Sequence, residues 1–208
     1  VKGSGNLDFR SSDLQIAGNF DLDNVPTGPL LGAILLEEQD AQRFGGVVSG
    51  RAMVQGDITN PKGVIRLKSP NLSIDGSELG ATRVLTNLGQ AGERITVNIN
   101  VKPKQGSISA FYALLSDGRM VLKTTLSKID IPLLTPVMGG IDLTGTLNGE
   151  ADLQGPPTAL NGTIALTASE LTAFGVHLEE TQINGITNEM VEGHKIEAEE
   201  VEEIVKEC

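Results

Sequence analysis

The chain has 208 residues, a length that leaves room for one large β domain or two small ones. Its formal net charge is −11. It contains 25 Gly and 9 Pro, whereas Trp is absent and aromatic residues make up only 3%, so any core must be aliphatic. No cluster of Lys and Arg is interleaved with aromatic residues, which argues against nucleic acid as a partner.

The first part of the chain has one segment of uncertain type. Residues 30–43 combine an apolar run with charged residues, a pattern that fits a short helix as well as a long strand followed by a loop. The sequence leaves both alternatives open. A tight reversal is expected at Gly56–Gly63, where an Asn-Pro pair and the flanking glycines have the chemistry of a turn.

Apolar and polar residues alternate between the later turns, as in strands that have one apolar face. Ile95–Val101 is the clearest case, and Arg119–Leu126 places Met120 and Leu122 on one side and Lys123 on the other. Such segments recur about every 10–12 residues, with no convincing long helix between them. The sequence therefore predicts an antiparallel, all-β array.

The last twenty residues have a different composition. Residues 189–208 hold eight Glu and two Lys, and so account for more than half of the net charge of −11. Ala198, Val201 and Ile204 stand at helical spacing, which predicts a short, amphipathic C-terminal helix. Cys208 is the only cysteine, which excludes an internal disulfide framework and a thiolate metal cluster.

No segment of the sequence has the properties of a membrane anchor or a leader. No apolar run approaches the roughly 18–20 residues that span a bilayer, and no basic start followed by an apolar stretch opens the chain. The chain also does not begin with Met. We therefore expect any targeting or anchoring segment to lie outside this fragment.

The sequence repeats itself at an offset of 99 residues. Gly46–Val84 aligns with Gly145–Ile183 without a gap, and thirteen of the 39 pairs are identical. The identical residues are mostly glycines, which mark turns, and aliphatic residues, which mark a buried face. We expect a single elongated β domain at 1–187, with repeat 1 at about 14–100, repeat 2 at about 120–187, and an acidic helical tail or linker at 188–208.

The repeated unit has a recognisable pattern of glycines and alternating aliphatics. The first copy reads Gly50-x-Ala-x-Val-x-Gly56, then Asn60-Pro-Lys-Gly63-x-Ile-x-Leu67, then Leu72-x-Ile-x-Gly76. The second copy repeats this order from Gly149 to Gly175, with Ala159-Leu160 in place of the Asn-Pro pair. The pattern covers most of residues 14–187 and resembles the repeat of the TamB and AsmA-like family of envelope proteins.

The resemblance implies a fold and a function. Proteins of that family are anchored in the inner membrane and cross the periplasm as long, curved antiparallel sheets that form an elongated U-shaped (taco-like) groove. The chain would then be a fragment of a non-enzymatic bridge, without a cofactor, that conducts phospholipid acyl chains between the inner and outer membranes. An outer-membrane β-barrel would be the partner of the full-length protein.

A groove that accepts acyl chains is better lined by Val, Ile and Leu than by bulky rings, which gives the scarcity of aromatics a physical reason. The residues expected to line it are Ile95, Val97, Ile99, Val101, Met120, Leu122, Leu126, Leu143, Leu147, Leu153, Ile164 and Leu166. Ordinary core packing is the simpler interpretation of the same residues, because alternation alone does not separate an open groove from a closed sandwich.

Two other functions stay open. One is a scaffold for outer-membrane protein assembly and secretion, in which exposed sheet edges pair with a client strand. The other is an extracellular β-helix adhesin, which would repeat every 20–25 residues or so and fits a period of 99 residues poorly.

Residue types that usually perform chemistry are sparse. His177 and His194 are the only histidines, too few for a metal site of the usual kind. Two pairs of neighbouring carboxylates have the chemistry of glycoside hydrolysis but are more simply charges on a solvated edge or loop: Asp21 with Asp23, and Glu37 with Glu38. The sequence therefore predicts no catalytic and no metal-binding residues.

Overall fold

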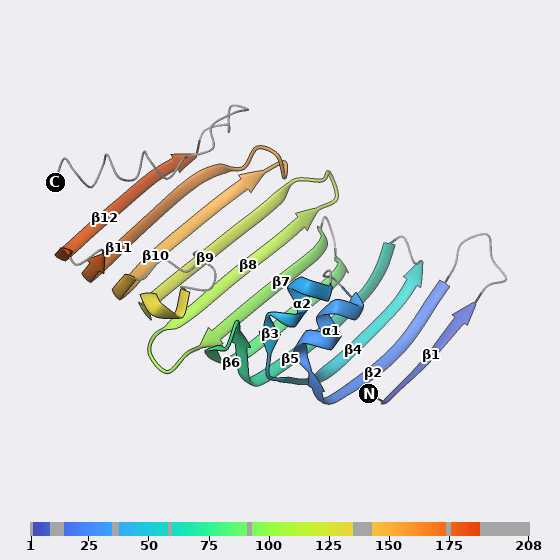
Figure 1. Cartoon of the computed structure of the whole chain (residues 1–208). Helices are drawn as coiled ribbons and strands as arrows, with labels where there is room; N and C mark the ends of the chain where they lie inside the picture. Colours follow the sequence, from blue (N-terminus) through green and yellow to red (C-terminus); the bar gives the residue numbers. More distant parts are fainter. Residues whose placement is uncertain are drawn as a thin grey trace.

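A computed structural model of the protein shows one layer of antiparallel β-sheet with three short helices (Figure 1). The structure describes residues 2–8, 15–34, 38–57, 60–90, 93–134, 143–173 and 176–187. The C-terminal helix expected at 189–208 lies outside these ranges.

The described part of the sheet contains twelve strands. They are β1 (Lys2–Asp8), β2 (Gln15–Pro26), β3 (Phe44–Gly45), β4 (Val47–Asp57), β5 (Asn60–Ile74), β6 (Ser77–Gln90), β7 (Glu93–Lys102), β8 (Ser107–Leu115), β9 (Met120–Asp130), β10 (Leu143–Gly155), β11 (Asn161–Ala173) and β12 (Val176–Thr187). The helices are α1 (Thr27–Ile34) and α2 (Glu38–Gln42), which follow β2, and the 3-10 helix η1 (Ile131–Leu134), which follows β9.

Strand order in the sheet follows chain order. Each strand lies beside the next one along the chain, except that β2 pairs with β4 and the two-residue β3 pairs with β5 off the main path. All of these pairs are antiparallel. The predicted antiparallel, all-β fold is therefore confirmed, and the described strands form a meander and not the stacked coils of a β-helix.

Tight turns with positive backbone φ angles join several of these strands. Asp75 (φ 48°) and Gly76 (φ 81°) form the two-residue connection between β5 and β6, where Ile74 pairs with Ser77. Two consecutive positive φ angles are typical of a type I′ turn, and Asp-Gly is a favoured sequence for it because its twist matches that of the flanking strands.

The segment at 30–43, for which the sequence left a helix and a strand open, contains helix. The end of α1 and all of α2 fall within it, and the two helices pack against each other. Gly28 permits a close approach, since a Cβ atom there would lie 2.9 Å from the carbonyl oxygens of both Ala41 and Phe44. The amide of Thr27 then donates a hydrogen bond of 3.0 Å to the carbonyl of Gly46, which joins the start of α1 to the start of β4.

The sheet is open, and little of it is buried. The strands make their main contacts with their sheet neighbours, and no second sheet packs on either face within the described ranges. Among the described residues, Ile129 is the largest side chain that is fully buried. The closed sandwich that the sequence left open is therefore not formed by the described residues.

The strand pairs of β4–β6 have counterparts in β10–β12. Gly50 is paired with Leu67 between β4 and β5, and Gly149 is paired with Leu166 between β10 and β11. These positions are 99 residues apart, the offset found in the sequence. The pairs between β5 and β6 match those between β11 and β12 at the same offset, except that Leu72 is paired with Gly80 whereas Leu171 is paired with Leu178.

Candidate functional site

One face of the sheet collects the aliphatic side chains of most strands. Directly paired residues of antiparallel strands point to the same side, so the register defines rows of side chains that run across the sheet. One such row is Phe20, Ala52, Ile65, Thr86, Val97, Tyr112, Leu122 and Leu153. The next row is Leu22, Gly50, Leu67, Val84, Ile99, Ala110, Thr124, Ala151 and Ile164. We call this side of the sheet the aliphatic face.

The twelve residues selected from the sequence all lie on the aliphatic face. In one row Leu114 stands between Ile95 and Met120, and in another Ile108 stands between Val101 and Leu126. Val101 is buried and the other eleven are half-buried. The complete set is Ile95, Val97, Ile99, Val101, Met120, Leu122, Leu126, Leu143, Leu147, Leu153, Ile164 and Leu166.

The aliphatic face extends beyond that set toward β2. Ile65, Leu67 and Val84 stand in the same rows, and so does the exposed side chain of Phe20. These four residues were not predicted to line the groove, although Ile65 and Leu67 belong to the repeat pattern. Period-two alternation with polar neighbours could have identified Phe20 and Leu67, whereas Ile65 and Val84 each have an apolar neighbour in the sequence.

One end of the aliphatic face is covered. The row that contains Val48, Ser69, Thr82 and Val101 is buried, whereas Arg83 beside it on the other face is exposed. This row lies at the strand ends from which α1 and η1 depart, and η1 contacts β6, β9 and β10 (Figure 1). Because burial at this level is confined to one side, these elements cover the aliphatic face and leave the polar face free.

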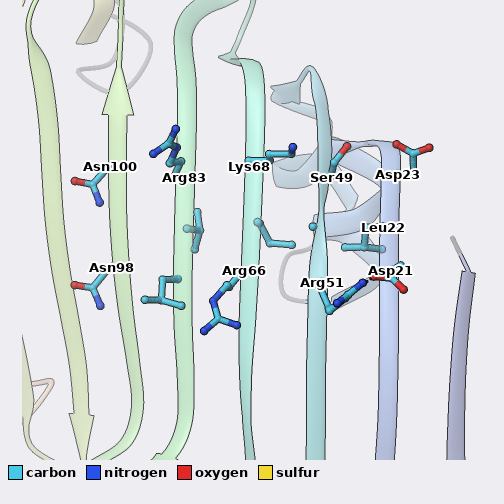
Figure 2. A pocket seen from close by; sticks show the side chains of 14 residues that line it. Asp21, Leu22, Asp23, Ser49, Arg51, Arg66, Lys68, Arg83, Asn98 and Asn100 are labelled. Atoms are coloured by element: carbon cyan, nitrogen blue, oxygen red, sulfur yellow. Dashed lines mark hydrogen bonds and ion pairs between the residues drawn. The ribbon is translucent and has the colours of Figure 1, made fainter.

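The opposite, polar face contains a groove of about 880 Å³ across β2 and β4–β7. Figure 2 shows the side chains that line it. One wall is formed by Asp21, Arg51, Arg66, Leu85 and Asn98, and the other by Asp23, Ser49, Lys68, Arg83 and Asn100. The floor is the backbone of Leu22, Gly50, Leu67 and Val84, whose row belongs to the aliphatic face.

This groove on the polar face was not predicted from the sequence. Its basic residues, Arg51, Arg66, Lys68 and Arg83, come from three strands and do not form a run in the sequence. They come together only through the register of β4, β5 and β6. A usable signal was present, because the positions 99 residues later carry no basic side chain.

The titratable candidates form no metal-binding cluster in the described ranges. There, no group of three or more His, Cys, Asp or Glu side chains is placed to hold a metal ion. His177 is exposed on β12, and its Nδ1 atom lies 3.2 Å from the hydroxyl oxygen of Thr172. Asp21 accepts a hydrogen bond of 2.7 Å from the Nε atom of Arg51. Of the remaining candidates, Glu38 begins α2, and His194, Glu37 and Cys208 lie outside the described residues.

No protein family, curated protein or solved structure matches the chain. The helices that the structure describes are all too short or too polar to cross a bilayer. The likeness to the TamB and AsmA-like family therefore depends on the residues of the repeat pattern alone.

Proposed function

We propose that the aliphatic face shields phospholipid acyl chains, as part of a periplasmic protein, anchored in the inner membrane when complete, that conducts lipid between the inner and outer membranes. The observation that supports this most strongly is the half-exposed state of the aliphatic residues. Val97 and Leu122 lie in the middle of the sheet, paired through Tyr112, and yet neither is buried. A single-layer sheet that exposes this much apolar surface needs a cover, and an acyl chain is one of matching chemistry.

The composition of the rows supports movement along the face. The rows through Ala52 and Gly50 contain aliphatic residues, Gly, Ala, Thr and two aromatics, and no charged side chain. Each methylene group removed from water contributes roughly 0.8 kcal/mol. Since no charged group on these rows fixes a headgroup in one place, a chain would exchange equivalent contacts as it moves.

A more specific form of this proposal is that the aliphatic face lines a U-shaped channel built from two repeats. The shared strand pairs of β4–β6 and β10–β12 support a repeated unit, and the cover that α1 and η1 give to one end of the aliphatic face supports a channel with one closed side. A U-shaped curvature of the sheet would supply the opposite wall.

Site-specific photocrosslinking in cells tests the proposal. A photoreactive residue at Val97 or Leu122 should capture phospholipid, because both positions belong to the aliphatic face. The matched controls, Asn98 and Lys123, are the next residues on the same strands and lie on the polar face. Native mass spectrometry of the purified chain should also find bound phospholipid. Equal capture at both kinds of position, or at neither, would contradict the proposal.

A second candidate function is a scaffold for outer-membrane protein assembly. Within the described sheet β12 pairs only with β11, so one side of its backbone is available for an added strand. Exposed strand edges bind extended segments by main-chain hydrogen bonds. Crosslinkers along β12 that capture an unfolded outer-membrane protein, with no lipid captured at Val97, would favour this function over lipid transfer.

A further inference from the structure

The groove on the polar face contains two pairs of like charges at directly opposed positions. Arg51 is paired with Arg66 between β4 and β5, and Lys68 is paired with Arg83 between β5 and β6. Directly opposed residues have Cβ atoms about 5 Å apart, and positions two residues apart on one strand are separated by about 7 Å. Like charges at such positions repel each other, so the cluster destabilises the sheet that contains it.

Only one of these four cations has an acidic partner within the described ranges. Arg51 forms an ion pair of 2.7 Å with Asp21. The other ion pairs there involve different residues, and none includes Arg66, Lys68 or Arg83. Three exposed positive charges on two neighbouring strands therefore lie on one face of a chain whose net charge is −11.

The fold does not require these cations. The positions 99 residues later are Glu150, Ala165, Thr167 and Gln182, and they form the same pairs in β10–β12: Glu150 with Ala165, and Thr167 with Gln182. Strand pairing of this kind thus forms with acidic, small or neutral side chains at all four positions. The basic cluster needs an explanation other than folding.

We propose that this groove binds a phosphate group, at a site on the opposite face of the sheet from the lipid-shielding surface. A carboxylate is satisfied by one bidentate Arg, whereas a phosphate offers three or four acceptor oxygens and up to two negative charges, and so can engage two Arg and one Lys together. Arg66, Lys68 and Arg83 supply that set. In Figure 2 their head groups point in different directions, so each would turn about its side-chain bonds to reach a shared phosphate.

The remaining lining fits the uncharged part of a small phosphorylated ligand. Asn98 and Asn100 lie along the walls beyond the cations, and their amides can donate and accept. The hydroxyl oxygen of Ser49 accepts a hydrogen bond of 3.0 Å from the amide of Asn24, which leaves its proton to donate. The ligand class is thus a small polar molecule, or a lipid headgroup, that contains a phosphate.

Calorimetric titration of the whole chain tests the site, with inorganic phosphate and sn-glycerol 3-phosphate as probes. The variant Arg66→Ala/Lys68→Thr/Arg83→Gln takes the residues found at the corresponding positions of β11 and β12, so we expect it to fold, as checked by circular dichroism. It should bind both probes at least about tenfold more weakly. The control Lys123→Gln lies on the same face but pairs with Asp152 at 2.7 Å, and should bind as the native chain does.

A second variant, which should gain binding, keeps the test informative if the first variant does not fold. Ala165→Arg/Thr167→Lys/Gln182→Arg places the three cations at the corresponding positions of β11 and β12 and should add phosphate binding there. Vesicles with and without anionic phosphatidylglycerol identify the source. Binding of soluble probes alone assigns a small phosphorylated molecule, and binding of anionic vesicles as well assigns a headgroup. No binding of phosphate at millimolar concentration, or equal binding by the triple variant, would overturn the proposal, while the crosslinks at Val97 would stay unaffected.

Discussion

The exposure of the aliphatic face predicts that one substitution will have very different costs at two positions. Ile129 is 0% exposed and lies beside Leu147, whereas Ile183 is 59% exposed and lies beside Leu166. Both belong to the aliphatic face. Ile→Ala removes the equivalent of three methylene groups, worth about 2.4 kcal/mol at full burial, and the cavity left behind raises the loss at Ile129 to about 3–4 kcal/mol. At Ile183 more than half of the side chain is already in water, so the loss is about 1 kcal/mol.

Equilibrium urea unfolding followed by far-ultraviolet circular dichroism measures this difference. Tryptophan fluorescence does not apply, because the chain has no Trp. Both variants should keep the dependence of the unfolding free energy on urea concentration, which scales with the surface exposed on unfolding, while the midpoint falls much further for Ile129→Ala than for Ile183→Ala. Equal losses would mean that Ile183 is covered by protein, and would refute the reasoning that the aliphatic face is open.

Two further predictions concern the turns and strand ends. Gly76→Ala should lower the free energy of unfolding by about 1 kcal/mol, because its φ of 81° disfavours a side chain although nothing lies within 4 Å of the added Cβ. Gly80→Ala (φ 88°) should lower stability clearly more in thermal unfolding, since its Cβ would also overlap the carbonyl of Lys102. Similar costs at the two glycines would contradict the overlap with Lys102 as the cause. The backbone amide and then the side chain of Arg119 donate hydrogen bonds to Asp117 and lower the pKa of that carboxyl. The stabilising effect of ionised Asp117 is therefore present above the ordinary aspartate pKa and is lost as pH falls through the lowered pKa. A titration of this carboxyl by NMR should have its midpoint below the ordinary value. Arg119→Ala should raise the pKa of Asp117 only in part, because the backbone amide still donates its hydrogen bond.

The architecture of the sheet was accessible from the sequence because it depends on local patterns. Alternation at Ile95–Val101 gives the face of each residue, and closely spaced turns favour antiparallel hairpins. The type of the segment at 30–43 was not accessible, because a short apolar run next to charged residues has no single period. The helices in and around this segment depend on a tertiary contact, the close approach of Gly28 to Ala41 and Phe44.

The two proposed functional surfaces also differ in how far the sequence predicts them. The aliphatic face follows from alternation within each strand, so its residues could be selected one strand at a time. The basic groove depends on which residue of β4 stands opposite which residue of β5 and β6. Arg51 and Arg83, for example, belong to one cluster only because β5 lies between them in a fixed register. Alternation gives the side of a residue but not its partner across the sheet.

The meander order of the strands has a consequence for how such a sheet forms and changes length. Because nearly every pair joins strands that are consecutive in the chain, loop closure is short at each step, and assembly can start at any hairpin and proceed outward. Each added strand widens the sheet by about 4.8 Å and touches only the strand before it. Duplication of a few hairpins would thus lengthen the molecule without disturbing existing pairs, as in solenoid proteins whose stability sums over nearest neighbours.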